Sequence, residues 1–586
     1  MATKPLQTRK KDISKVGDEL GKLIGQNWSQ WNTQRQGKIN EWKELRNYVF
    51  ATDTTTTSNS TLPWKNKTTI PKLCQIRDNL HSNYISALFP NDEWVKWEGY
   101  SLNDATKVKK EAIEAYIRNK CRMNGFRSIT SQLVYDYIDY GNVFGTVDYE
   151  IRYRPGRRSN EMVVAYQGPV LKRISPLDIV FDPTAATFEK APKIVRSLVT
   201  IGELYEMADS EPDNAYLAKA LKTREDICSR PAAYGFEEDS RIEAYQVDGF
   251  GNYMEYLESG YVEMLTFYGD IFDIGSRKLN KGRRIVVIDR MHVIENEPIP
   301  QWLGDSPIYH AGWRTRPDNL WAMGPLDNLV GMQYRIDHLE NLKSDAMDLA
   351  VLPPLVIAGE VEEFTYAPGA EIHIDENGTV TELARNAQWV IQAENAIQVT
   401  EQRMEMYAGA PREAMGIRTA GEKTAFEVQQ LQNAAGRIFQ EKITNFEVEF
   451  VEKILNAMLE TGVRNMDGKD IVSVMDNDIG AQIFQTITRA DIVANGVLRP
   501  IGARHFAAQA QLMQNLNGIF NSPLGQSLAP HTSTKRLAAL VEDTLGLSRY
   551  ELFHPNTDIA EQQETQTAMN AAQEEIMAQQ QTEPLP

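Results

Sequence analysis

The sequence predicts an α+β fold that is predominantly helical. Up to about residue 140, apolar side chains recur at three- and four-residue steps, which is the spacing of an amphipathic helix. At Gly141 the spacing changes to every second residue, as in a half-buried strand. From Pro325 the helical spacing returns. We therefore expect a helical N-terminal part, a β-rich middle part and a second helical part.

The N-terminal part is expected to contain several helices. Residues 12–50 have helical spacing, and the Thr/Ser run 54–61 that follows is typical of a flexible loop. Residues 71–89 and 105–140 predict three more helices. The apolar face of the first of these consists of Leu73, Ile76, Leu80, Tyr84 and Leu88.

The middle part is expected to consist mainly of strands. Apolar and polar residues alternate from Val147 to Tyr153, and Pro155-Gly156 supplies a turn before a strand that begins at Met162. Strands continue to about residue 312. Helices near 201–207 and 210–228 interrupt them.

Two helices separated by an insert are predicted after Gly324-Pro325. Proline suits the first turn of a helix, and Pro353-Pro354 would end this one after about 36 Å. Residues 354–389 predict a compact β-like insert with a turn at Glu376-Asn377-Gly378. A second helix is expected at about 390–407.

The C-terminal part is expected to be mostly helical. A Gly- and Pro-containing loop, 409–422, precedes Thr424 and Glu427, which form a capping box for a long helix. A short mixed segment then extends to Pro500, and further helices reach about Leu552. The Gln/Glu/Ala-rich tail from Glu561 has few apolar anchors.

Composition limits the classes of function. A chain of 586 residues needs several packed units. The 62 basic and 80 acidic residues give a net charge of −18, which disfavours tight binding to nucleic acid but suits a wall past which DNA slides. No apolar run is long enough for a bilayer and the start of the chain is polar, so we expect a protein made in the cytoplasm, with no membrane partner. The three cysteines are far apart and predict buried free thiols.

No motif predicts an enzyme, a metal or a cofactor. Residues 416–424 differ from a phosphate-binding loop by one inserted residue, Glu422, whose carboxylate would oppose phosphate. The acid pairs Asp136/Asp139 and Asp476/Asp478 lack companions for metal or acid–base chemistry, and the eight histidines have no zinc-type spacing. A basic cluster with two tyrosines on a predicted hairpin would bind nucleic acid, form a solvated tip or contact another subunit, and these readings stay open; it contains Tyr149, Arg152, Tyr153, Arg154, Arg157 and Arg158.

Several short motifs occur in an order that resembles the portal, or head-to-tail connector, proteins of tailed bacteriophages, most of all those of short-tailed phages. None of the motifs is specific alone, but their order spans most of the chain. The motifs are Ala87-Leu88-Phe89-Pro90 followed by Trp94; Gly141 to Asp148; Ile174 to Asp178, leading to Phe181-Asp182-Pro183; Thr200 to Leu204; Tyr309 to Arg314 before Gly324-Pro325; and Thr424 to Val428.

The resemblance implies the portal fold and a division of the chain into wing, stem, clip and crown around a central channel. The regions are 1–323 as the wing, helical and then β-rich; 324–352 as the descending stem helix; 353–389 as the clip; 390–408 as the ascending stem helix; 409–423 as the tunnel loop; 424–499 as the long wing helix and return segment; and 500–586 as the helical crown with a flexible tail.

The resemblance also implies a function without catalysis. Portal subunits form a ring, typically of twelve, at one vertex of the capsid in the virion, after assembly in the host cytoplasm. The ring is the channel for genome packaging and ejection. It contacts the terminase large subunit, then a head–tail adaptor, and also the major capsid and scaffold proteins, while double-stranded DNA passes without sequence-specific contacts. The alternative is another structural virion or head–tail joining component without a DNA channel.

Three groups of site residues follow from this layout. The channel-lining stem residues are expected to be Asp337, Glu340, Lys343 and Asp348. The DNA-facing tunnel-loop residues are expected to be Arg412, Glu413, Arg418, Glu422 and Lys423. The acidic clip residues that would dock partners are Glu360, Glu362, Glu363 and Glu371.

Overall fold

The structure is a computed structural model of the chain, and its described part is mixed helix and strand, 52% helical and 29% strand, with no closed barrel. Both kinds of element predicted from the sequence are therefore present. The described residues are 13–89, 94–101, 103–104, 106–156, 162–210, 212, 214–229, 260–273, 277–300, 306–351, 355–358, 379–382, 388–408, 441–466, 469–475 and 482–501.

The first predicted helix is divided into two. Helix α1 (Ile13–Gln34) and helix α2 (Gln36–Val49) meet at Arg35, which has φ −90° and ψ 1°. The Arg35 guanidinium is buried and donates hydrogen bonds to the carbonyl oxygens of Pro176 (2.7 Å) and Ile179 (2.6 Å). These carbonyls lie far away in the sequence, so helical spacing alone could not reveal the break.

The segment after α2 is ordered, so the expectation of a flexible loop is wrong. It forms two short 3₁₀ turns, η1 (Thr54–Thr56) and η2 (Ser58–Thr61), in which Thr54, Thr57 and Asn59 are buried. The Asn59 side chain donates to the carbonyl of Tyr334 at 3.3 Å. Short polar side chains hydrogen-bond readily to nearby backbone, which allows such a sequence to fold when it has a surface to lie on.

Three further helices confirm the periodicity prediction. They are α3 (Lys72–Leu88), α4 (Lys107–Asn124) and α5 (Phe126–Asp139). All five residues of the predicted apolar face of α3 are buried. Gly125, with φ 74°, ends α4 and allows the sharp turn into α5, because glycine adopts this left-handed conformation without a steric penalty.

The change of period at Gly141 marks the first of two larger sheets. Strand β2 (Asn142–Pro155) pairs in antiparallel fashion with β3 (Met162–Ile174) and with β9 (Ile308–Gly312), giving the order β3-β2-β9. The second sheet is a meander in chain order: β4 (Ile179–Phe181), β5 (Lys193–Thr200), β6 (Tyr261–Asp273), β7 (Lys278–Ile288) and β8 (His292–Pro298).

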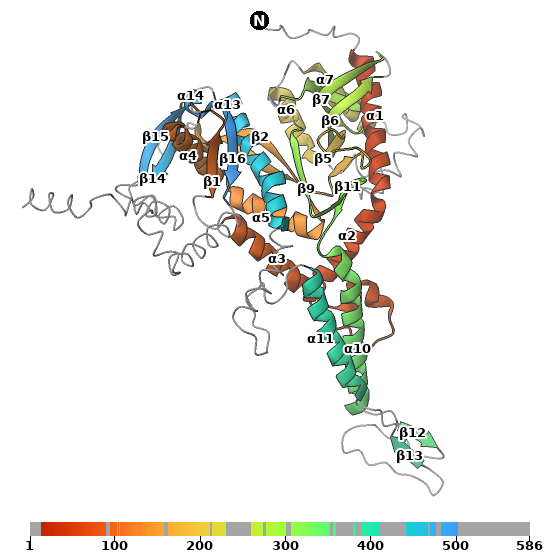
Figure 1. Cartoon of the computed structure of the whole chain (residues 1–586). Coiled ribbons are helices and arrows are strands. Elements are labelled where there is room, and N and C mark those ends of the chain that lie inside the picture. The colour runs from red at the N-terminus through yellow and green to blue at the C-terminus, as the bar shows by residue number, and fades with distance from the viewer. Residues whose placement is uncertain are drawn as a thin grey trace, which may run out of the picture.

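Helices cover both faces of the five-stranded sheet, as Figure 1 shows. Ile285 and Val287 of β7 pack in one cluster with Leu20, Ile24 and Trp28 of α1. The intervening residues of β7 pack on the other face against α6 (Ile201–Ser210) and α7 (Ala215–Ser229). Successive strand residues point to opposite faces, so the four consecutive apolar residues 285–288 of β7 contribute side chains to two cores.

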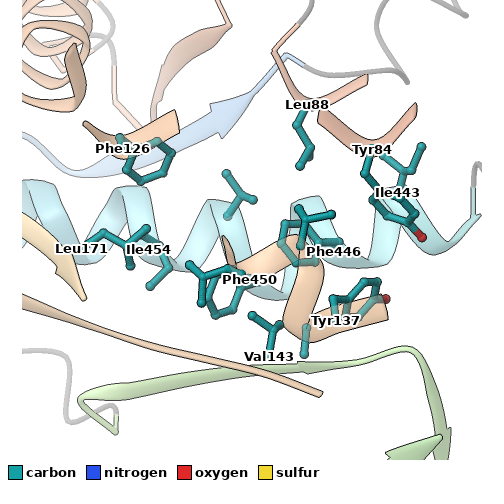
Figure 2. Packing of buried hydrophobic residues seen from close by; sticks show 14 of the residues in the cluster. Tyr84, Leu88, Phe126, Tyr137, Val143, Leu171, Ile443, Phe446, Phe450 and Ile454 are labelled. Carbon is teal, nitrogen blue, oxygen red and sulfur yellow. The ribbon is translucent and has the colours of Figure 1, made fainter. Parts of the chain in front are cut away.

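The largest core surrounds the helical segment that begins in the described part at residue 441. Figure 2 shows Ile443, Phe446, Phe450 and Ile454 pointing toward residues of α3, α5 and β2. This segment contains a π-helical turn (η5, Glu447–Glu452) and continues as α13 (Lys453–Asn465). The remaining described C-terminal elements are β14 (Lys469–Met475), β15 (Gln482–Thr488), α14 (Arg489–Ile492) and β16 (Gly496–Pro500), of which β16 pairs with β1 (Val95–Gly99).

A pair of helices projects from this body (Figure 1). Small strands β10 (Arg314–Arg316) and β11 (Asn319–Met323) lead to a 3₁₀ turn, η4 (Asp327–Leu329), and then to α10 (Val330–Val351). Helix α11 (Gln388–Tyr407) returns to the body. Between them, β12 (Leu355–Ala358) and β13 (Thr379–Glu382) form an antiparallel pair at the far end. No helix in the described ranges is long and apolar enough to cross a membrane.

Candidate functional site

The candidate site is the projecting part of the molecule, which we call the stalk and define as α10, α11, β12 and β13. Helix α10 has 22 residues and is therefore about 33 Å long. Figure 1 shows α10 and α11 side by side, with the strand pair at the end away from the body. The predicted order of helix, β-like insert and helix is thus present in the chain.

A strap from the N-terminal part, residues 65–70, lies along α10 and contacts it from Gln333 to Asp348. Polar side chains at four-residue steps on α10 bind its backbone, because residues four apart lie on one face of a helix. The contacts run in order along both segments. Ile70 N–H donates to Asp337 Oδ1 (3.1 Å), Thr68 N–H donates to Asn341 Oδ1 (2.8 Å) and Asn66 N–H donates to Asp345 Oδ1 (3.1 Å).

Asn341 and Gln333 also donate to the strap. Asn341 Nδ2 donates to the carbonyl of Thr68 at 2.7 Å, so the Asn341 side chain pairs with both backbone groups of that residue. Gln333 Nε2 donates to Asp337 Oδ1 at 2.9 Å and to the carbonyl of Ile70. The buried side chains of Gln333, Asp337 and Asn341 are thereby hydrogen-bonded, and α10 is held in one orientation about its axis.

The expectation that Asp337 lines a channel is wrong. Its side chain is 0% exposed and accepts hydrogen bonds from Thr69, Ile70 and Gln333. Burial, which outweighs these hydrogen bonds, raises the pKa of Asp337 to about 6. The residue therefore orients α10 on the strap. The four-residue spacing of Gln333, Asp337, Asn341 and Asp345 was a usable sequence signal for this role, but nothing in the sequence named the strap as the partner.

Asp337 gives a pH-dependent prediction. Its folded pKa lies above the unfolded value of 3.8, so the folded state binds more protons between about pH 4 and pH 6. The contribution of this group to stability is therefore fully present below about pH 4 and is lost as pH rises through about 6. We expect Asp337→Asn to melt at a temperature that varies less between pH 4 and pH 7 than that of wild type. Differential scanning fluorimetry across this range, with Asp348→Asn as the control, measures the difference, and identical pH profiles would contradict it.

Glu340 and Lys343 connect the two stalk helices. Lys343 Nζ lies 2.6 Å from Glu340 Oε2 and 2.8 Å from Glu394 Oε2 of α11. These carboxylates raise the pKa of Lys343 against the opposing effect of burial. Asp348 is exposed and accepts a 2.9 Å hydrogen bond from Asn66. Of the four predicted stem residues, only Asp348 presents an exposed charge in the single chain.

The root of the stalk is held by a buried ion pair. Lys72 Nζ at the start of α3 lies 2.6 Å from Glu405 Oε1 near the end of α11, and both side chains are only 6% exposed. Ile397 and Met404 of α11 are buried in the largest core. The end of α11 is therefore fixed to the body, immediately before residue 409.

The outer surface of the stalk carries many exposed apolar side chains. Ile391 (64% exposed), Val399 (45%) and Met406 (59%) lie on one face of α11, since steps of eight and seven residues return to the same side of a helix. Further exposed apolar residues on the stalk are Leu342, Met347, Val351, Val356, Ile357, Trp389 and Tyr407. Single exposed apolar residues are common, but a group on one narrow projection marks an interaction surface.

The other predicted site residues lie outside the described residues. These are the tunnel-loop residues Arg412, Glu413, Arg418, Glu422 and Lys423 and the clip residues Glu360, Glu362, Glu363 and Glu371. The capping box at Thr424 and Glu427, the turn at 376–378 and the region after residue 501 are also outside them.

The acids Asp136 and Asp139 each form an ion pair with an arginine. Arg173 makes a two-pronged contact with Asp136 (2.5 and 2.7 Å), and Arg77 makes one with Asp139 (2.6 and 2.8 Å). Within the described ranges, no group of three or more His, Cys, Asp or Glu side chains is placed to hold a metal ion.

Of the basic cluster, Arg152 pairs with Glu150 at 2.8 Å on the exposed end of the β2–β3 hairpin.

Comparison with known proteins adds no assignment to this geometry. No protein-family profile matches the chain, and no curated protein matches it either.

Proposed function

We propose that this chain is the subunit of a ring-shaped portal, or head-to-tail connector, of a tailed bacteriophage. In this proposal the stalks of all subunits together surround a channel for double-stranded DNA during packaging and ejection. The strand pair at its tip docks the terminase motor and later a tail adaptor, and the body contacts capsid and scaffold proteins. The connector function, at the portal vertex, requires no catalytic step.

The observation that carries the proposal is the apolar surface of the stalk. In a single chain, two narrow helices expose Ile391, Val399 and Met406 on one face and Leu342 and Met347 on the other helix. This exposure does not stabilise a monomer. Neighbouring stalks packed around a ring would bury the apolar surface, which would stabilise the ring by about 25 cal/mol per Å² buried. The rigid attachment through the strap and the Lys72–Glu405 pair suits a part that keeps one orientation in an assembly.

Charge supports the same proposal. The net charge of −18 disfavours tight phosphate binding, and DNA that slides through a channel must not be held by its wall. In the proposal, Asp348 contributes to this repulsion, and the loop 409–423 would supply weak, salt-sensitive contacts through Arg412, Arg418 and Lys423.

Electron microscopy of the purified chain tests the proposal. We expect closed rings with a central opening and a sedimentation coefficient far above that of a 66.4 kDa monomer. The double variant Ile391→Lys/Val399→Lys should leave soluble monomers with an unchanged melting temperature, because both side chains are exposed in the single chain.

The matched control is Leu198→Lys, which places a lysine at an exposed apolar position on β5 of the body (51% exposed) and should leave rings intact. Wild-type protein that stays monomeric at high concentration would refute the proposal. Open filaments or discs without an opening would favour a joining component that has no DNA channel.

A further inference from the structure

A buried lysine contacts a serine that lines a large cleft in the body. Lys193 is the first residue of β5 and is only 1% exposed. Its Nζ lies 2.7 Å from Ser306 Oγ, 3.2 Å from the carbonyl oxygen of Glu189 and 4.4 Å from the centre of the Phe188 ring. Ser306 is partly exposed and lines a cleft of about 800 Å³.

The surroundings of the Lys193 amine favour its neutral form. Within the described residues, no carboxylate lies within ion-pair distance of Nζ. Nζ donates to Ser306 Oγ and to the Glu189 carbonyl and lies over the Phe188 ring, and loss of one proton from the ammonium would leave a lone pair that can accept the Ser306 hydroxyl proton. Burial lowers the pKa of Lys193 to about 7, and the Glu189 charge only partly opposes this.

The other titratable groups around Lys193 are either neutral or paired with each other. Tyr268 lies opposite Lys193 on β6, and burial raises its pKa, so it carries no charge near neutral pH. Burial lowers the pKa of His310, so it is also neutral. The charged groups nearby are Glu189 and Lys453, which form an ion pair with each other at 3.1 Å.

We propose that Ser306 is a nucleophile activated by Lys193 and that the cleft accepts an uncharged or cationic carboxylic ester. A buried amine next to a hydroxyl is one of the arrangements that activate serine for acyl transfer. The charge class follows from the lining, where Glu189, Glu449, Glu452 and Glu460 outnumber Lys453 and Arg316. This activity would be separate from the connector function and does not depend on it.

The chemical step balances within this pair. Lys193 Nζ takes the hydroxyl proton as Ser306 Oγ bonds to the acyl carbon, and the resulting ammonium returns that proton to the departing alkoxide, which leaves as an alcohol. Water then attacks the acyl-serine and gives a proton to Lys193, which passes that proton to Ser306 Oγ as the C–O bond breaks and the carboxylic acid leaves, so that the serine and the neutral amine are both restored. No oxidant, reductant or further reactant is needed.

A nucleophile probe tests the pair in the intact chain. A fluorophosphonate probe should form one phosphonyl adduct, on Ser306, with loss of fluoride, as identified by peptide mass spectrometry. The rate should rise about tenfold between about pH 6 and pH 8, because the neutral fraction of a lysine with a pKa near 7 rises by that factor. Incubation with p-nitrophenyl butyrate should add one butyryl group to the same peptide.

Variants separate chemistry from structure. Ser306→Ala should abolish the adduct, and Lys193→Met, which keeps the length of the side chain, should slow its formation about a hundredfold. The controls are Ser197→Ala, a half-buried serine of the same strand as Lys193, and Lys190→Met, an exposed lysine nearby. If Lys193→Met proves to be unfolded, the wild-type pH profile decides. Labelling of Ser306 that is no faster than that of other serines at pH 8, or that does not change with pH, would overturn the proposal.

Discussion

Replacing Phe446 with alanine should lower the free energy of unfolding by about 3–5 kcal/mol, the range seen when a buried phenylalanine is truncated. The Phe446 side chain is 0% exposed. Its ring centre lies 5.0 Å from that of Tyr137, 5.4 Å from that of Phe450 and 6.4 Å from that of Tyr84 (Figure 2). Removal of the ring would leave a cavity where α3, α5 and the helix beginning at residue 441 meet.

Scanning calorimetry measures this effect as a lower temperature for the unfolding transition. The matched control is Phe272→Ala, because Phe272 is 52% exposed on β6 and its loss should cost no more than about 0.5 kcal/mol. Equal effects of the two variants would mean that the cluster around Phe446 does not dominate the stability of the body.

Replacing Lys72 with methionine should also cost about 3–5 kcal/mol, because it leaves the Glu405 carboxylate buried without its partner lysine. The damage should be concentrated at the root of the stalk, where this pair joins α3 to α11. Hydrogen exchange followed by mass spectrometry should show faster exchange in the last turns of α11. Exchange in the five-stranded sheet should stay unchanged.

The double variant Lys72→Met/Glu405→Leu distinguishes a lost attraction from an uncompensated charge. It should recover most of the lost stability, since an apolar pair of similar size avoids the cost of burying two charges. As the exposed control, Lys453→Met removes a partner of Glu449, with side chains 38% and 56% exposed, and should cost less than about 1 kcal/mol. A double variant as unstable as Lys72→Met would show that the pair itself supplies the stability.

Residue periodicity predicted the elements whose stability depends on one apolar face. The face of α3 and the change of period at Gly141 are both present in the structure. So are the two helices within the β-rich part and the helix–strand–helix order of the stalk. These patterns are local, because burial of one face imposes a repeat of about 3.6 residues on a helix and of two on a strand.

Periodicity could not predict what a polar side chain contacts. Asp337 has the spacing of a solvent-facing helix residue, but the strap 65–70 covers it and Thr69 and Ile70 bind its carboxylate. Arg35 sits in a run of helical spacing, yet the carbonyls at 176–179 bind it where the helix breaks. In both cases the partner is more than a hundred residues away in the chain.

The sequence by itself determined where most of the described helices and the strands of the middle part lie, which faces are apolar and that the chain carries excess negative charge. Only the tertiary structure decided that β1 pairs with β16, that the strap fixes α10 and that Lys193 meets Ser306. The physical reason is that amphipathic patterning follows from burial of a continuous face, whose signal repeats along many residues. A hydrogen bond or an ion pair between distant segments depends instead on one donor and one acceptor, which leave no repeating pattern in either segment.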